Sequence, residues 1–127
     1  MRGFVRSLAT AFVLFTAGAA SSALADPPAR VGRLSLIEGD VTFRDTATRE
    51  SSLATLNWPV TAGAAISTAP GAHAEVRIGS TAIRLDGATA LEFTQVDDQA
   101  IRLRLEYGAA TVRVRSREVV GEIVLET

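Results

Sequence analysis

The feature that most constrains the fold is an alternation of apolar and polar residues with a period of two. It is clearest at residues 101–107, where the sequence IRLRLEY changes character at every step. Such a period places successive side chains on opposite faces of a β-strand. The same alternation recurs from Val31 onward, and helical periodicity is nearly absent. We therefore expect an all-β domain whose strands each bury one face.

Glycine, proline and aspartate divide the alternating segments into short strands. The Ala69–Ala72 sequence APGA predicts a type II turn, because proline fixes the first central φ and glycine tolerates the positive second one. Hairpins are predicted at residues 38–40 and 79–80, and further turns at 86–87, 97–99 and 108. Residues 45–57 predict a loop, with Leu53 and Leu56 as candidate anchors to the core.

The expected architecture is an antiparallel β-sandwich or roll of roughly eight to ten short strands connected by hairpins. The last strand is expected at residues 119–126. A short stack of hairpin layers is the alternative.

Residues 1–25 have the composition of a secretory signal peptide, helical only in the precursor. Arg2 and Arg6 precede an apolar stretch at residues 8–20, and Ala23 and Ala25 are small enough for the pockets of the signal peptidase. We expect cleavage between Ala25 and Asp26 and a periplasmic or secreted product that meets the membrane only transiently. The alternative is an uncleaved anchor, because residues 8–25 carry no charge.

The remaining residues, 26–127, suffice for a single core. The whole chain has 13 basic and 14 acidic residues, so loss of Arg2 and Arg6 leaves 11 against 14 and a formal charge of −3. This balance argues against nucleic-acid binding. The chain has no cysteine, which excludes disulfides and lipid attachment through a thiol.

Several segments together resemble the periplasmic FecR domain of bacteria. The similarity covers about residues 30–127 and rests on the order of segments rather than on any one of them. The segments are GRLS at 32–35, EGDV at 38–41, WPVTAGAAIST at 58–68, AEVRIGS at 74–80, IRL at 83–85, LRLEYG at 103–108 and VRV at 112–114.

Three departures from the family pattern bear on what the resemblance implies. Gly63 is followed by Ala64, where family members usually have aspartate, so an aspartate-capped turn is missing. Only seven residues precede the apolar stretch, too few for the cytoplasmic anti-sigma segment of signal-transducing members. Family members commonly continue past the point where this sequence stops at Thr127, so we expect a fragment or a shortened member with an exposed last strand.

The resemblance implies a non-catalytic module for protein binding or envelope sensing and signalling, with an envelope protein or polymer as partner. The recognition surface would be a sheet face or an open edge strand. A carbohydrate- or envelope-polymer-binding module is the alternative, with Trp58 and Tyr107 as aromatic candidates, although both are more often core residues. An enzyme is a third and weaker hypothesis.

The residues themselves offer no constellation for catalysis, a cofactor or a metal. His73 is the only histidine and is expected in a solvated turn, without a second histidine or a cysteine to complete a site. Asp97 and Asp98 lack the ligand spacing of a calcium loop and predict a hairpin turn. Gly79 and Ser80 lack the setting of a nucleophile elbow.

Six arginines occupy the polar phase of the expected strands and suggest a cationic stripe across one sheet face. They are Arg77, Arg84, Arg102, Arg104, Arg113 and Arg115, of which the last four form the candidate binding surface. Such a stripe would suit anionic glycans, lipopolysaccharide phosphates or an acidic partner. The favoured alternative is neutralisation by cross-strand pairing with Glu75, Glu92, Glu106 and Glu118.

Overall fold

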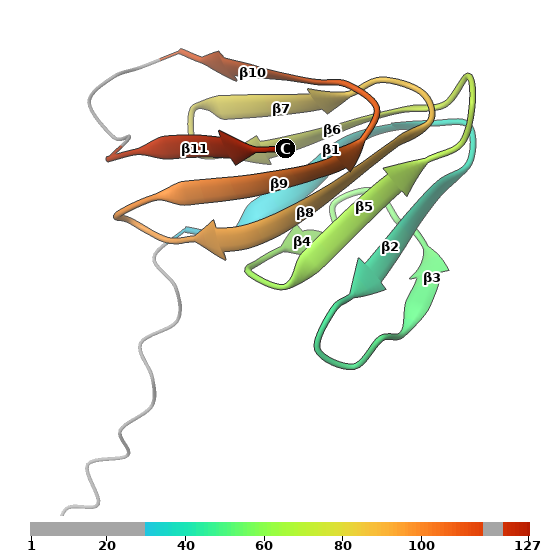
Figure 1. The fold of residues 1–127 in the computed structure, drawn as a ribbon, viewed down its shortest axis with the longest axis horizontal. Coiled ribbons are helices and arrows are strands. Elements are labelled where there is room, and N and C mark those ends of the chain that lie inside the picture. Colours follow the sequence, from blue (N-terminus) through green and yellow to red (C-terminus); the bar gives the residue numbers. More distant parts are fainter. Residues whose placement is uncertain (1–29, 116–120) are drawn as a thin grey trace, which may run out of the picture.

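The all-β prediction is confirmed by a computed structural model that describes residues 30–115 and 121–127. In that part of the chain the structure has eleven strands and no helix (Figure 1). The expected signal-peptide helix at residues 1–25 lies outside the described residues.

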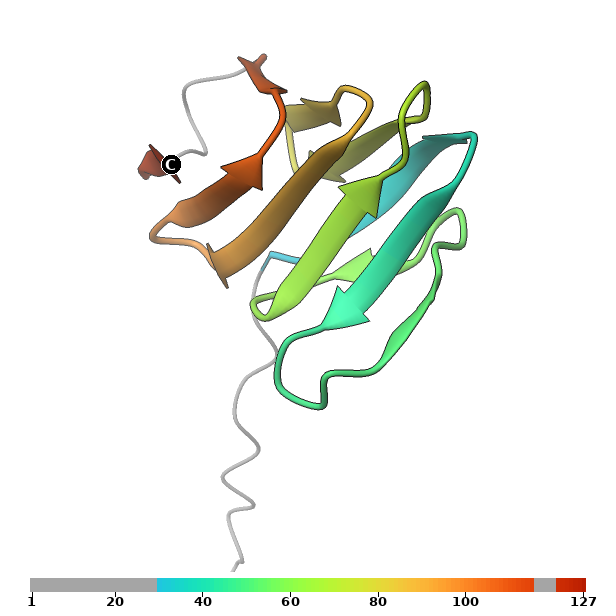
Figure 2. The same cartoon turned by 45° about the vertical axis from the view of Figure 1, so that its right-hand side comes forward.

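The strands form two sheets that pack face to face as a sandwich (Figures 1 and 2). In spatial order, sheet I consists of β10 (Ala110–Val114), β7 (Thr81–Leu85), β6 (His73–Ile78), β1 (Gly32–Glu38) and β4 (Pro59–Val60). Sheet II consists of β11 (Ile123–Glu126), β9 (Ile101–Tyr107), β8 (Thr89–Val96), β5 (Ala64–Thr68), β2 (Val41–Asp45) and β3 (Ser51–Leu53).

The pairing is antiparallel with one exception. β11 runs parallel to β9, with Ile123 opposite Ile101 and Leu125 opposite Leu103. The expectation of a purely antiparallel sandwich is therefore wrong at this edge of sheet II. The last strand covers only part of the predicted 119–126, and residues 119 and 120 lie outside the described residues.

Most connections carry the chain from one sheet to the other. Only three consecutive pairs of the described strands form hairpins, namely β2–β3, β6–β7 and β8–β9. The hairpin predicted at residues 79–80 is confirmed, and so is the turn at 97–99. The hairpin predicted at residues 38–40 is wrong, because β1 belongs to sheet I and β2 to sheet II. The turns near residues 86–87 and 108 also change sheets.

The type II turn predicted at residues 69–72 is confirmed. The Ala72 amide donates a hydrogen bond to the Ala69 carbonyl oxygen at 2.9 Å, and Gly71 has a φ of +80°. This turn also changes sheets, since it leads from β5 to β6.

The segment predicted as a loop at residues 45–57 contains the edge strand β3, and its two leucines are not core anchors. Leu53 is 78% exposed and Leu56 is 53% exposed. The register explains Leu53, because it lies opposite Thr42, whereas the neighbouring Val41 and Phe43 contact the core. A side chain level with Thr42 projects from the other face of the sheet.

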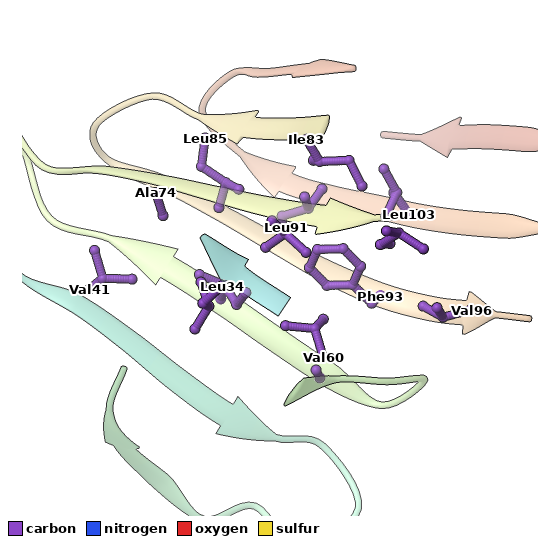
Figure 3. Packing of buried hydrophobic residues seen from close by; sticks show 14 of the residues in the cluster. Leu34, Val41, Val60, Ala74, Ile83, Leu85, Leu91, Phe93, Val96 and Leu103 are labelled. Atoms are coloured by element: carbon purple, nitrogen blue, oxygen red, sulfur yellow. The ribbon is translucent and has the colours of Figure 1, made fainter. Parts of the chain in front are cut away.

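The core lies between the two sheets and is built from the apolar phase of their strands (Figure 3). Phe93 of β8 is completely buried and is the largest of the fully buried side chains. It packs in one cluster with Leu34 and Ile83 of sheet I and with Leu91 and Leu103 of sheet II. The period of two seen in the sequence thus separates the buried face of each sheet from its outer face.

Gly108, at the corner between β9 and β10, is predicted to be the glycine least tolerant of a side chain. Its φ is +92°, and a Cβ there would collide with Thr89 and with the Ala88 carbonyl oxygen. We expect Gly108→Ala to lower the free energy of unfolding by about 3 kcal/mol or more, since strain and steric overlap add. Gly71→Ala is the control, because Gly71 also has positive φ but no atom within 4 Å of the added Cβ. It should cost about 1 kcal/mol. If urea unfolding shows that Gly108→Ala and Gly71→Ala lower the free energy of unfolding equally, the steric explanation is contradicted.

Candidate functional site

The structure divides the arginines of the predicted binding surface between the two sheets. Arg102 and Arg104 lie on β9 in sheet II, whereas Arg113 lies on β10 in sheet I and Arg115 directly follows that strand. A single stripe across one sheet face is therefore not formed. The cause is the connection at Gly108, which takes the chain from sheet II to sheet I.

The arginines of β9 are engaged in ion pairs. Arg104 pairs with Glu92 on the neighbouring strand β8, where the two residues lie directly opposite each other. Arg102 lies 3.9 Å from the Glu122 carboxylate. The predicted cross-strand pairing is confirmed for Glu92 and for Glu75, which lies opposite Arg84 on β7. Glu106 has no ion pair among the described residues, and Glu118 lies outside them. Both arginines of β9 therefore offer less free positive charge than the sequence suggested.

The outer face of sheet I has a different character, because it carries a groove of about 630 Å³. Its lining comes mainly from β6, β7, β10 and the turn between β6 and β7, and includes Arg77, Arg84, Arg113 and Arg115. We call this feature the arginine groove. It joins Arg113 and Arg115 with the two arginines left out of the predicted surface.

Strand register explains why a hollow exists among these long side chains. Ala82 on β7 lies opposite Arg77 of β6 on one side and opposite Arg113 of β10 on the other. All three belong to the outer phase of their strands, so a methyl group separates two guanidinium-bearing side chains whose Cα atoms are about 10 Å apart. Ala82 therefore forms the floor of the arginine groove. In the sequence, the one signal for this groove was a small residue in the polar phase of a strand.

Glu75 organises two of the arginines. Its side chain is 10% exposed, and one carboxylate oxygen accepts a hydrogen bond from Arg77 Nε at 3.1 Å. The other oxygen accepts from a terminal nitrogen of Arg84 at 3.1 Å. The Ser35 hydroxyl lies 3.4 Å from the first oxygen, beside an irregularity in the β1–β6 pairing. Glu75 thus fixes both guanidinium groups while they remain more than half exposed.

The pKa of Glu75 reflects this setting. Burial by itself raises the pKa of the carboxyl group, but hydrogen bonds and positive charge from Arg77 and Arg84 together outweigh burial and hold the pKa below its ordinary value. Glu75 is therefore ionised at neutral pH and serves as a fixed counter-charge.

The arginine groove keeps a positive excess. Its charged lining comprises four arginines and two acidic residues, Glu75 and Asp86, a net formal charge of +2. Arg113 and Arg115 have no carboxylate within 4.0 Å among residues 30–115 and 121–127. The whole chain has a formal charge of −1, so positive charge is concentrated on this face.

The other candidate residues occupy ordinary structural positions. His73 begins β6 instead of lying in a turn, and it pairs across the sheet with Glu38 beside a hollow of about 250 Å³. Asp97 accepts hydrogen bonds from the Gln99 and Ala100 amides, which closes the β8–β9 turn as predicted, and Asp98 lies 3.8 Å from Arg30. In the described part of the chain, no group of three acidic or histidine side chains could hold a metal ion.

The two aromatic candidates are exposed, in contrast to the expectation that they belong to the core. Trp58 is 46% exposed and Tyr107 is 57% exposed. Trp58 packs edge-to-face against Phe43 with ring centroids 6.1 Å apart. Tyr107 lies at the end of β9, and neither residue lines the arginine groove.

Comparison of the chain with protein-family models, with curated proteins and with solved structures gave no match. Within the described ranges, the structure contains no helix long and apolar enough to cross a membrane.

Glu75→Gln tests the ion-paired centre of the groove. We expect it to lower the free energy of unfolding at pH 7 by about 1–2 kcal/mol, because glutamine keeps the shape but loses the charge-assisted hydrogen bonds. Since folding lowers the pKa of Glu75, its contribution is complete above the ordinary value of 4.5 and is lost as the pH falls through the folded-state value. The difference between wild type and Glu75→Gln should therefore shrink in acid.

Urea unfolding over a pH series measures this difference. Glu106→Gln is the matched control, because Glu106 is exposed and has no ion pair among the described residues. It should change stability by less than about 0.5 kcal/mol. A Glu75→Gln effect that stays constant down to strongly acidic pH would show that the side chain acts through packing alone.

Proposed function

We propose that residues 26–127 form a FecR-like, non-catalytic binding module of the bacterial envelope, which residues 1–25 direct to the periplasm or outside the cell. The observation that carries the proposal is the arginine groove. It has the volume typical of a ligand site, and its lining comes largely from hydrogen-bonded strands that hold it in shape.

The chemistry of the groove supports binding rather than catalysis. A general acid needs a pKa near the operating pH, whereas the pKa of Glu75 is lowered and its carboxylate is occupied by two arginines. Arginine stays protonated and recognises anionic groups through paired N–H donors. These properties suit reversible recognition of a negatively charged surface.

A carbohydrate- or envelope-polymer-binding module is the second candidate. The exposure of Trp58 and Tyr107 favours it, because exposed aromatic rings offer flat apolar faces for sugar rings. The two residues lie on different elements, and only Trp58 has an aromatic neighbour. We therefore place the principal binding surface on sheet I.

Capture from a periplasmic extract tests the binding role. We expect the tagged chain to retain a specific envelope protein, and Arg113→Glu to reduce its recovery at least about tenfold by reversing a charge in the groove. Arg44→Glu is the matched control, since Arg44 is exposed on β2 of sheet II and lies opposite Ala65, as Arg113 lies opposite Ala82. It should leave recovery within about twofold. If the chain recovers only polysaccharide, and Trp58→Ala abolishes that recovery, the carbohydrate- or envelope-polymer-binding module is favoured.

The export step predicts a product that begins at Asp26. Mass spectrometry of the protein recovered from the periplasm should show loss of residues 1–25, and Ala25→Leu should block processing because the side chain is too large for the peptidase pocket. A mature protein that retains residues 1–25 would show that the segment is an anchor.

A further inference from the structure

We infer that the arginine groove binds a phosphate monoester, held between Arg77 and Arg113 above Ala82. This inference rests on the proposed function, because it assigns a ligand class to the same groove. It follows from the placement of donors, from the charge of the lining and from a hydroxyl group without a partner.

The donors are arranged around one small hollow. Arg77 uses Nε to bind Glu75, so its two terminal nitrogens remain available. Arg84 uses one terminal nitrogen in the same way. Arg113, on the far side of Ala82, has no carboxylate partner in the described part of the chain. Three guanidinium groups thus border a floor formed by one methyl group, and a tetrahedral anion can accept hydrogen bonds from several of them at once.

The charge of the groove matches a phosphate monoester better than a carboxylate. The lining has a net formal charge of +2, and a phosphate monoester carries about −1.5 to −2 at pH 7. A carboxylate carries only −1 and would leave positive charge uncompensated. Because Glu75 holds the guanidinium groups of Arg77 and Arg84 in place, these two arginines need no large rearrangement before an anion binds.

The turn between β6 and β7 supplies a further observation. Ser80 lines the groove, and its buried hydroxyl group has no hydrogen-bond partner among the described residues. Thr81 also has an unpaired hydroxyl group in this part of the chain, but its side chain lies in the inner phase of β7 with Ile83 and Leu85 and does not face the groove. Buried polar groups in folded proteins are normally hydrogen-bonded, so the unused Ser80 hydroxyl at this end of the groove indicates that a polar partner belongs there.

Binding can be measured by titrating the purified chain with glucose 1-phosphate, using NMR chemical shifts or calorimetry. We expect saturable binding that Arg113→Gln and Arg77→Gln each weaken at least about tenfold. Ala82→Leu should also weaken it, because the larger side chain fills the floor without changing the charge. Arg44→Gln removes the same charge from sheet II and should stay within about twofold of wild type.

Two further probes identify the source of the phosphate. If the chain binds both glucose 1-phosphate and, in a separate experiment, phosphatidylcholine vesicles that carry phosphatidate, the site accepts phosphate monoesters in general, including lipid headgroups. Binding of the sugar phosphate alone would restrict it to soluble or polymer-linked phosphates. Both results support the inference.

Other outcomes overturn the inference. If Arg44→Gln weakens binding as much as Arg113→Gln, only diffuse electrostatic attraction is present. If no phosphate probe binds wild type while Arg113→Glu still abolishes capture of an envelope protein, the phosphate assignment fails and the binding role stands. If neither phosphate binding nor capture depends on Arg113, both fail.

Discussion

The burial of one face of every sheet between two packed layers is the constraint on which the rest of this structure depends. The chain has no cysteine, so no disulfide assists a domain of about a hundred residues. Apolar residues from both sheets meet around Phe93 in one contiguous cluster. Because that cluster uses the inner phase of the strands, only the outer faces and the edges of the sheets are available to a ligand.

The same constraint limits what the sequence can predict. The period of two identifies the alternating strands and their buried phase correctly, since alternation is a property of each strand alone. It misses β3, whose sequence SSL does not alternate. It does not tell which strands pair. Gly39, Gly79 and Gly108 all follow an alternating segment, yet the chain forms a hairpin only at Gly79 and changes sheets at the other two. Hairpin turns and corners use the same residues, and long-range packing decides between them.

The candidate site was predicted only in part for the same reason. The phase of the six arginines was correct, but the corner at Gly108 separates Arg104 from Arg113 and places them on different sheets. The groove is formed instead where Arg113 meets Arg77 and Arg84 of an earlier hairpin. The sequence could not identify Ala82 as a candidate, because its role as the floor of the groove depends on the residues opposite it on two neighbouring strands and not on its own chemistry.

The arginines of the two sheets differ in how far neighbouring carboxylates neutralise them. On sheet II, Arg104 lies directly opposite Glu92, so attraction and repulsion largely cancel for any approaching ligand. On sheet I, Glu75 serves two arginines at once, while Arg113 lies opposite an alanine. One carboxylate thus orients two guanidinium groups without cancelling their combined charge. An acidic chain can in this way present one positive face, and the concentration of charge on that face follows from strand register rather than from net charge.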